Sequence, residues 1–287
     1  MAHLLTKLLC CCAVFVAFIN PTWSLNYQKR NLQTITAIYN RTVYPANLAF
    51  LQNGTGSVPA GLFNPNASGR VSPVGNFSGF QESTEYFFAL APVPRAPTYV
   101  AFTKAQIVEF TSGCPEVAAS VVYFTNSVVN ATAADNGKYI TTLKQVAFWK
   151  FDREGAVLYY DAWIPNLAPY NAIQTTTLTP QVEAGEIEQL CGAVQQECVG
   201  GNTQYNSTAD CVRTLSGKPF GDWDEVWGDN VVCRQVHAIL AAVDPVVHCP
   251  HVGPTGGGKC VNEPYNEGYF DDEALFGSPE GQTFMCK

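Results

Sequence analysis

Seven of the eight cysteines that follow residue 24 lie beyond residue 190, and this distribution constrains the fold more than any other feature. An even number of cysteines in an exported chain predicts a framework of disulfides. If all eight pair within the chain, Cys114 must bond to a cysteine from the C-terminal segment and so fasten the two halves together. The eight candidates are Cys114, Cys191, Cys198, Cys211, Cys233, Cys249, Cys260 and Cys286.

Residues 1–24 have the features of a secretory signal peptide. Lys7 precedes the apolar run LLCCCAVFVAFI, which is too short to span a bilayer, and Thr22 and Ser24 are small residues before a cleavage site. A basic pair at residues 29–30 then allows two interpretations, a short propeptide at 25–30 or an ordinary part of the mature chain. We expect a secreted, extracellular protein that keeps no membrane span after signal cleavage.

Six N-x-Ser/Thr sequons support this expectation, because exported chains carry glycans at such sites. The formal net charge is −8, and no basic stripe is visible that would bind phosphates, so a nucleic-acid partner is not expected. The predicted glycosylation sites are Asn40, Asn53, Asn66, Asn76, Asn130 and Asn206.

Strand-like segments dominate residues 99–164, after a predicted short helix within 31–52 and a loop-rich stretch over 53–98. Within the strand region, two strands flank the polar turn DREG at residues 152–155. Both faces of the second strand are largely apolar, so we expect this hairpin to be covered on both sides. The predicted fold class is α+β.

The C-terminal segment is predicted to be mainly helical. Its best helix pattern covers residues 222–243, with Asp222 as the cap and Pro245 after its end. The sequence GPTGGGKC at 253–260 fits G-x-x-x-x-G-K but has Cys260 where a phosphate-binding loop needs Ser or Thr. We therefore interpret it as a tight structural loop between cysteines and not as a nucleotide site.

The order of a helix, loops and long antiparallel strands, with the "FDREG" turn and the "YYDAW" strand, resembles the nuclear-transport-factor-like cone, which includes the SnoaL-type polyketide cyclases. The resemblance covers residues 31–170 and implies a curved antiparallel sheet wrapped with helices around an apolar cavity. It implies binding, isomerisation or cyclisation of a hydrophobic small molecule. Asp161 is then the acid/base candidate, with Tyr159, Trp163 and Trp149 as binding residues.

One departure and two further segments accompany this resemblance. Residues 31–190 contain no histidine, so the usual Asp–His pairing has no local partner. Residues 171–190 are a predicted connector, and residues 191–287 are a predicted disulfide-rich domain. Its block WGDNVVCRQVH…HCPHVGPTGGGKC resembles a type of secreted fungal protein.

The three histidines beyond residue 24, His237, His248 and His251, all fall within fifteen residues. Neutral imidazoles bind copper or zinc, so this cluster is a candidate metal site, and His237 is also a candidate catalytic residue. A Cys233–Cys249 bond would draw the rings together. Asp229 or Asp244 could then supply a fourth ligand. In the alternative interpretation, the rings satisfy buried carbonyls around the disulfides.

The sequence thus leaves three hypotheses open. The first is a cone-type protein that binds or converts a hydrophobic small molecule through Asp161. The second is a metal or redox protein built on the histidine cluster. The third is a non-catalytic extracellular glycoprotein whose C-terminal unit is an interaction module.

Overall fold

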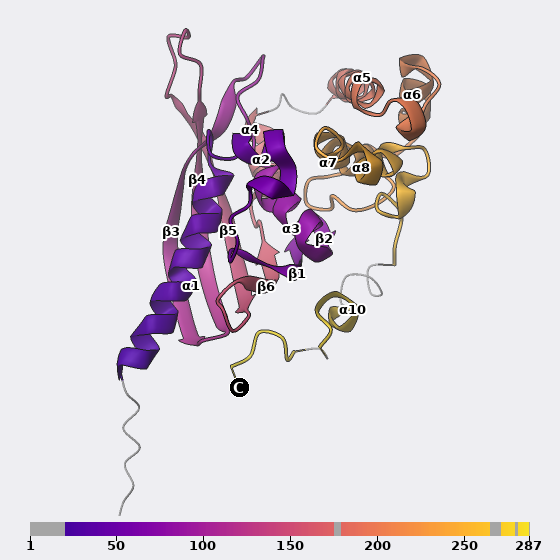
Figure 1. Ribbon diagram of the computed structural model, residues 1–287. Coiled ribbons are helices and arrows are strands. Elements are labelled where there is room, and N and C mark those ends of the chain that lie inside the picture. The colour runs from indigo at the N-terminus through magenta and orange to yellow at the C-terminus, as the bar shows by residue number, and fades with distance from the viewer. Residues whose placement is uncertain (1–20, 175–178, 265–270, 279–280, 287) are drawn as a thin grey trace, which may run out of the picture.

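The computed structural model describes residues 21–174, 179–264, 271–278 and 281–286. Within these residues, a region built on a six-stranded sheet is followed by a group of short helices that lies beside one edge of the sheet (Figure 1). Residues 1–20 of the predicted signal peptide lie outside the described residues. Its remaining residues, 21–24, form the start of the first helix. Within the described ranges no helix combines the length and the apolar character needed to cross a membrane.

The sheet region contains three helices, one 3-10 turn and six strands. They are α1 (Pro21–Thr42), α2 (Leu48–Asn53), η1 (Gly54–Ser57), β1 (Phe63–Ser72), β2 (Gly75–Phe77), α3 (Gly79–Phe88), β3 (Val100–Cys114), β4 (Val117–Val128), β5 (Tyr139–Phe151) and β6 (Val157–Trp163). The strand order is β2-β1-β6-β5-β4-β3. The expected antiparallel pairing holds throughout, except that β1 runs parallel to β6, so the sheet is mixed.

The inner face of the sheet is covered by α1 and α3, and aromatic rings fill the space between them. Trp149 on β5 is fully buried against Tyr39 of α1 and Phe87 of α3. Its indole N–H donates to Ser120 Oγ at 2.9 Å, so the ring brings no unsatisfied donor into the core. Burial of each such ring contributes about 2–3 kcal/mol. The interior expected to be an apolar cavity is therefore packed with side chains around Trp149.

The outer face of β6 is covered by the end of the chain. Tyr159 packs against Phe276 of α10 (Asp272–Phe276), and Phe148 of β5 packs against Phe284. Figure 1 shows the C-terminal segment returning toward the sheet from the group of short helices. The side chains of Phe148 and Trp163 on this face nevertheless remain 42% and 37% exposed, so the prediction that the hairpin is covered on both faces is confirmed only in part.

The four disulfides have the connectivity Cys114–Cys286, Cys191–Cys211, Cys198–Cys249 and Cys233–Cys260. The prediction that Cys114 bonds to a C-terminal cysteine is confirmed, across a separation of 172 residues. The Cys233–Cys249 bond, considered above as one possibility, does not form. Cys233 bonds to Cys260 at the end of the glycine-rich loop, whereas Cys249 bonds to Cys198 at the end of a neighbouring helix.

The helices between the sheet and α10 are α4 (Leu167–Gln174), α5 (Pro180–Glu197), α6 (Thr208–Leu215), α7 (Val231–Ala241) and α8 (Pro245–Val252), with 3-10 turns η2 (Gly200–Asn202) and η3 (Gly256–Gly258). α4 packs on β5, whereas the helices from α5 to α8 pack around the three disulfides of the C-terminal segment. The helix predicted over 222–243 is shorter, because the Asn230 side chain caps α7 by accepting from Cys233 N at 2.7 Å. Pro245 begins α8, where Asp244 is the cap.

Gly69 on β1 gives a test of the packing on the inner face. A Cβ atom at this position would lie 2.2 Å from Cε2 of Tyr160, which is fully buried. We expect Gly69→Ala to lower the free energy of unfolding by about 3 kcal/mol in urea denaturation, because the ring has no room to move. Gly185→Ala is the matched control, since no atom lies within 4 Å of its Cβ position and alanine stabilises a helix interior. Equal effects of the two substitutions would contradict this packing.

Candidate functional site

A pocket of about 210 Å³ lies where α7 and α8 meet the β1–β2 turn and α3. Phe77, Val236 and Leu240 contribute apolar walls. The polar and charged groups come from Asn76, Glu82, His237, His248, His251, Lys259 and Glu263. The site thus joins side chains from both halves of the chain.

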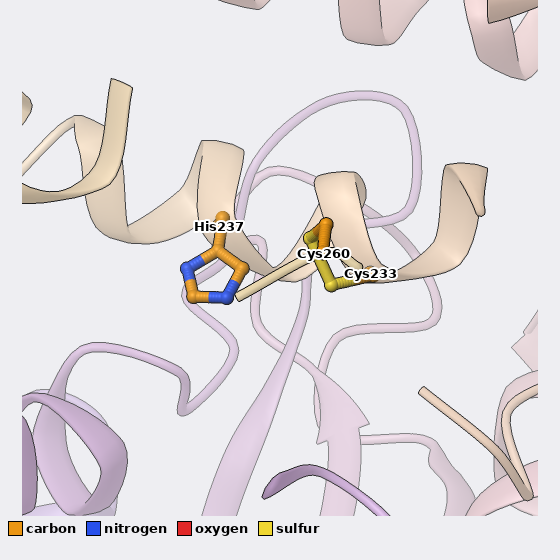
Figure 2. A group of neighbouring side chains, drawn as sticks. All are labelled: Cys233, His237 and Cys260. Carbon is orange, nitrogen blue, oxygen red and sulfur yellow. A yellow bond between two sulfur atoms is a disulfide. The ribbon is translucent and has the colours of Figure 1, made fainter. Parts of the chain in front are cut away.

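The three imidazole rings converge on one another, as the sequence predicted. His237 Nδ1 lies 3.2 Å from His248 Nδ1 and 3.2 Å from His251 Nδ1. One ligand atom from each ring lies within 4.8 Å of the other two. Figure 2 shows His237 next to the Cys233–Cys260 disulfide, on α7. The other two rings are carried by α8.

Glu85 of α3 completes this arrangement from the other half of the chain. Its carboxylate accepts a hydrogen bond from His248 Nε2 at 2.9 Å, and both side chains are buried. In the tautomer with a proton on Nε2, the Nδ1 atom of His248 carries a lone pair that points toward the His237 ring. Metal-binding histidines commonly donate their second nitrogen to a carboxylate in this way.

Burial keeps two of the rings neutral. Desolvation, followed by the nearby His251 and His248 rings, holds the pKa of His237 well below 6.5. Desolvation, followed by His248 and Lys259, lowers the pKa of His251 to about 4. At neutral pH both rings therefore have a lone pair available for a hydrogen bond or a metal ion.

The spacing of the nitrogens suits a metal ion. With a proton on His237 Nδ1, a single N–H faces the lone pairs of both His248 Nδ1 and His251 Nδ1. With that proton on Nε2 instead, three Nδ1 lone pairs converge, and one metal cation at the centre can accept all three. Ligand bonds of roughly 2.0–2.1 Å at tetrahedral angles place two nitrogens about 3.3–3.4 Å apart, close to the separations found here. Cys233 and Cys260 also lie near His237, but their sulfurs are joined in a disulfide and offer no thiolate.

The predicted carboxylate ligands lie elsewhere. Asp229 accepts from Arg234 and from Lys218 at 2.7 and 2.8 Å, and these cations lower its pKa. Asp244 caps α8 and accepts from Gln81. The expectation that one of them joins the rings is wrong, because each already has a structural role. Glu85, which the sequence analysis missed, is the carboxylate in contact with the cluster.

Asp161 does not line the pocket. Its carboxylate accepts from Arg70 at 2.5 and 3.2 Å on the outer face of the sheet, and Arg70 also pairs with Asp272. Burial raises the pKa of Asp161, and the hydrogen bonds from Arg70 oppose this shift. The expectation that Asp161 faces an apolar cavity is wrong, because β6 presents it to an ion pair beneath α10.

The three predicted binding aromatics do not share one surface. Trp149 is buried on the inner face, while Tyr159 and Trp163 alternate with the inward-facing Tyr160 and so lie on the outer face. Trp163 packs edge-on against Phe148. None of the three is among the residues that line the histidine pocket.

The predicted glycosylation sites are accessible to different degrees. Four of the six asparagines are exposed, namely Asn40, Asn53, Asn66 and Asn206. Asn76 and Asn130 are half-buried, and Asn76 lies at the edge of the histidine pocket.

The depressed histidine pKa values predict how stability depends on pH. An unfolded histidine titrates near 6.5, so below this pH the unfolded chain binds protons that the folded chain excludes. Stability is therefore complete above pH 6.5 and is lost as the pH falls toward 4. For His251 alone we expect a loss of about 2 kcal/mol between pH 7.5 and 5.0. Urea denaturation with a chelator present measures this, and His251→Gln is expected to flatten the dependence. An unchanged pH dependence in that variant would contradict the expectation.

Comparison with known proteins places this architecture in a family. The BfoA family C-terminal domain matches residues 157–263, a range that includes all three pocket histidines. Bifonsecin B biosynthesis cluster protein A of Aspergillus brasiliensis is 31% identical over 255 residues, 84% of this chain and 82% of that protein. Aurasperone B biosynthesis cluster protein A of Aspergillus niger is 30% identical over 253 residues, 83% of this chain and 79% of that protein.

Solved structures match about half of the chain. A putative polyketide cyclase from Xanthomonas campestris pv. campestris is 11% identical, with a TM-score of 0.34 over 52% of this chain and 99% of that one. A putative SnoaL-like polyketide cyclase from Jannaschia sp. CCS1 is also 11% identical, with a TM-score of 0.35 over 52% of this chain and 94% of that one.

The fold and the site define a disulfide-linked α+β protein with a three-histidine pocket between its two halves. Its sequence identity and coverage assign it more closely: the chain belongs to the BfoA family of fungal biosynthesis cluster proteins.

Proposed function

We propose that this protein holds a divalent metal ion, zinc or copper, on His237, His248 and His251, and uses it to act on a hydrophobic small molecule in a cyclase- or isomerase-like reaction. The observation that carries the proposal is the convergence of three Nδ1 atoms beside a pocket, with His248 oriented by the buried carboxylate of Glu85. A structural network alone would pair each ring with a backbone carbonyl, whereas here the rings face one another.

The chemistry follows from the groups that line the pocket. A bound metal ion would polarise a carbonyl oxygen of the small molecule and so acidify a neighbouring C–H. Glu82 lines the same pocket and is the candidate proton acceptor, held in place by a hydrogen bond from Ser78 N at 2.7 Å. Phe77, Val236 and Leu240 would hold the apolar part of the molecule and exclude water.

The relatives support a biosynthetic context. Their names attach them to bifonsecin B and aurasperone B biosynthesis clusters, and we extend a role in the biosynthesis of a small molecule to this chain. Four disulfides suit an oxidising compartment, so we include secretion and glycosylation in the proposal. Arg30 donates to Pro115 O at 2.6 Å, a contact that favours keeping the basic pair in the mature chain.

Metal analysis of the purified protein tests the proposal. The protein should be produced through a secretory pathway and purified with a tag that contains no histidine, because the site itself consists of histidines. We expect about one zinc or copper ion per chain by mass spectrometry, and its loss in His248→Ala. Asp161→Asn is the matched control and should retain the metal, since Asp161 is bound by Arg70 outside the pocket. A wild-type protein that takes up neither metal would overturn the proposal.

A further inference from the structure

The glycine-rich loop at residues 253–260 forms one wall of the histidine pocket. Gly257 has a φ of 54°, and a Cβ atom there would lie 2.6 Å from the carbonyl carbon of Pro250 and 2.9 Å from Cδ2 of His251. Glycine is therefore required for the loop to pack against α8 and the His251 ring. The close packing brings the loop's last two residues, Lys259 and Cys260, to the pocket side of the helices.

Two anchors fix the ends of this loop. Arg234, which is fully buried in α7, donates to Gly253 O at 3.2 Å and to Pro254 O at 3.4 Å. Cys260 is bonded to Cys233 on the same helix. Lys259 is thus held between a disulfide and the pocket, although its side chain is long and flexible.

Among the residues that the structure describes, the ammonium group of Lys259 makes two long contacts. Its Nζ lies 3.3 Å from Asn76 O and 3.4 Å from Glu82 Oε2, whereas charge-assisted hydrogen bonds are usually about 2.7–2.9 Å. An ammonium group has three donors, so a better acceptor inside the pocket would compete with these contacts. Its side chain is 36% exposed. The charge also helps to lower the pKa of His237 and His251, in agreement with a position close to the rings.

We infer that Lys259 binds an anionic oxygen of the small molecule, and that the pocket therefore selects hydrophobic acids, phenols or enols, over neutral hydrocarbons. This inference rests on the small-molecule function proposed for the same pocket. A volume of about 210 Å³ corresponds to roughly seven water molecules at about 30 Å³ each, enough for a single ring with its substituents. The apolar walls would hold the ring and Lys259 its charged oxygen.

4-Nitrophenol and nitrobenzene, two probes that differ by one oxygen atom, test this selection. 4-Nitrophenol has an acidic oxygen and a phenolate that absorbs visible light, and nitrobenzene lacks that oxygen. In metal-depleted protein, where Lys259 is the cationic side chain among the described residues that line the pocket, we expect the phenolate to bind about tenfold more tightly than nitrobenzene. The absorbance of 4-nitrophenolate should also show a lowered pKa of the bound probe. Benzoate serves as a third probe, so that carboxylic and phenolic oxygens are compared.

The variants separate charge from packing. Lys259→Met should remove the preference for 4-nitrophenolate and for benzoate while leaving nitrobenzene binding unchanged, and Lys259→Arg should restore the preference. Lys138→Met, at an exposed lysine between β4 and β5, is the matched control and should behave as wild type. Binding of 4-nitrophenolate that is unaffected by Lys259→Met would overturn the inference. Metal content is measured separately, so failure of the metal proposal remains distinguishable from failure of this one.

Discussion

His237→Ala is expected to lower the affinity of the protein for zinc by more than about 100-fold, the largest effect of any substitution in the pocket. His237 is the central ligand, because its Nδ1 lies 3.2 Å from the Nδ1 atoms of both His248 and His251. Its removal leaves two imidazoles on α8 without the third donor that α7 provides. Competition with a chromophoric chelator at pH 7.5 measures the change.

The zinc affinities of Glu85→Gln and Glu82→Gln compare a carboxylate that contacts a histidine ring with one that lies outside the ring cluster. Glu85 holds the Nε2 proton of His248, so its replacement by an amide should cost about 10–100-fold in zinc affinity. Glu82 is bound by Ser78 N and Lys259, outside the ring cluster, and its replacement should change the affinity by no more than about threefold. Equal effects of the two substitutions would show that Glu85 does not orient a ligand.

Arg234→Met is expected to destabilise the protein by about 3–5 kcal/mol. The Arg234 guanidinium is fully buried and donates to Asp229 at 2.7 Å, Asn230 O at 2.8 Å and Gly253 O at 3.2 Å. Methionine fills a similar volume but removes these three hydrogen bonds, although Asp229 keeps its bonds from Lys218 and Gly253 O its bond from Gly256 N. Urea denaturation followed by tryptophan fluorescence measures the free energy of unfolding.

Arg213→Met is the matched control for this prediction. Its side chain is 76% exposed and pairs with Asp210 one turn earlier on α6, so the loss should stay below about 1 kcal/mol. A buried arginine that tolerates methionine as well as Arg213 does would contradict the anchoring role assigned to it. The glycine-rich loop would then owe its position to the Cys233–Cys260 disulfide alone.

The sequence predicted those features that depend on counting and local spacing. Parity required a partner for Cys114, and the structure supplies Cys286. The clustering of three histidines predicted that their rings meet, which they do. Both inferences hold whatever the exact path of the chain, because an odd cysteine count and a short segment restrict the possible arrangements.

Features that depend on tertiary packing were predicted poorly. Alternation along β6 correctly grouped Asp161 with Tyr159 and Trp163, but both faces of the strand are apolar, so the pattern could not show which face meets the helices. Glu85 lies more than 150 residues before His248 in a stretch interpreted as loops. One signal was present there, since Glu82 and Glu85 are spaced three apart, as on one face of a helix.

Lys259 was overlooked for a different reason. The loop that carries it fits a phosphate-binding motif except at the Ser/Thr position, which is occupied by Cys260, a residue that the structure places in a disulfide. The rejected motif nevertheless forms a wall of the pocket. Its glycines are required by the close approach to His251, a constraint that becomes visible only when α8 and the loop are seen together.

X-ray absorption spectroscopy of the zinc-loaded protein tests the three-histidine centre most directly. We expect three imidazole nitrogens bonded to the zinc ion at roughly 2.0–2.1 Å, reduced to two in His237→Ala. We expect no sulfur near 2.3 Å from the zinc ion, because Cys233 and Cys260 remain joined as a disulfide beside His237. A first shell made of oxygen alone, or one containing sulfur, would contradict the central claim.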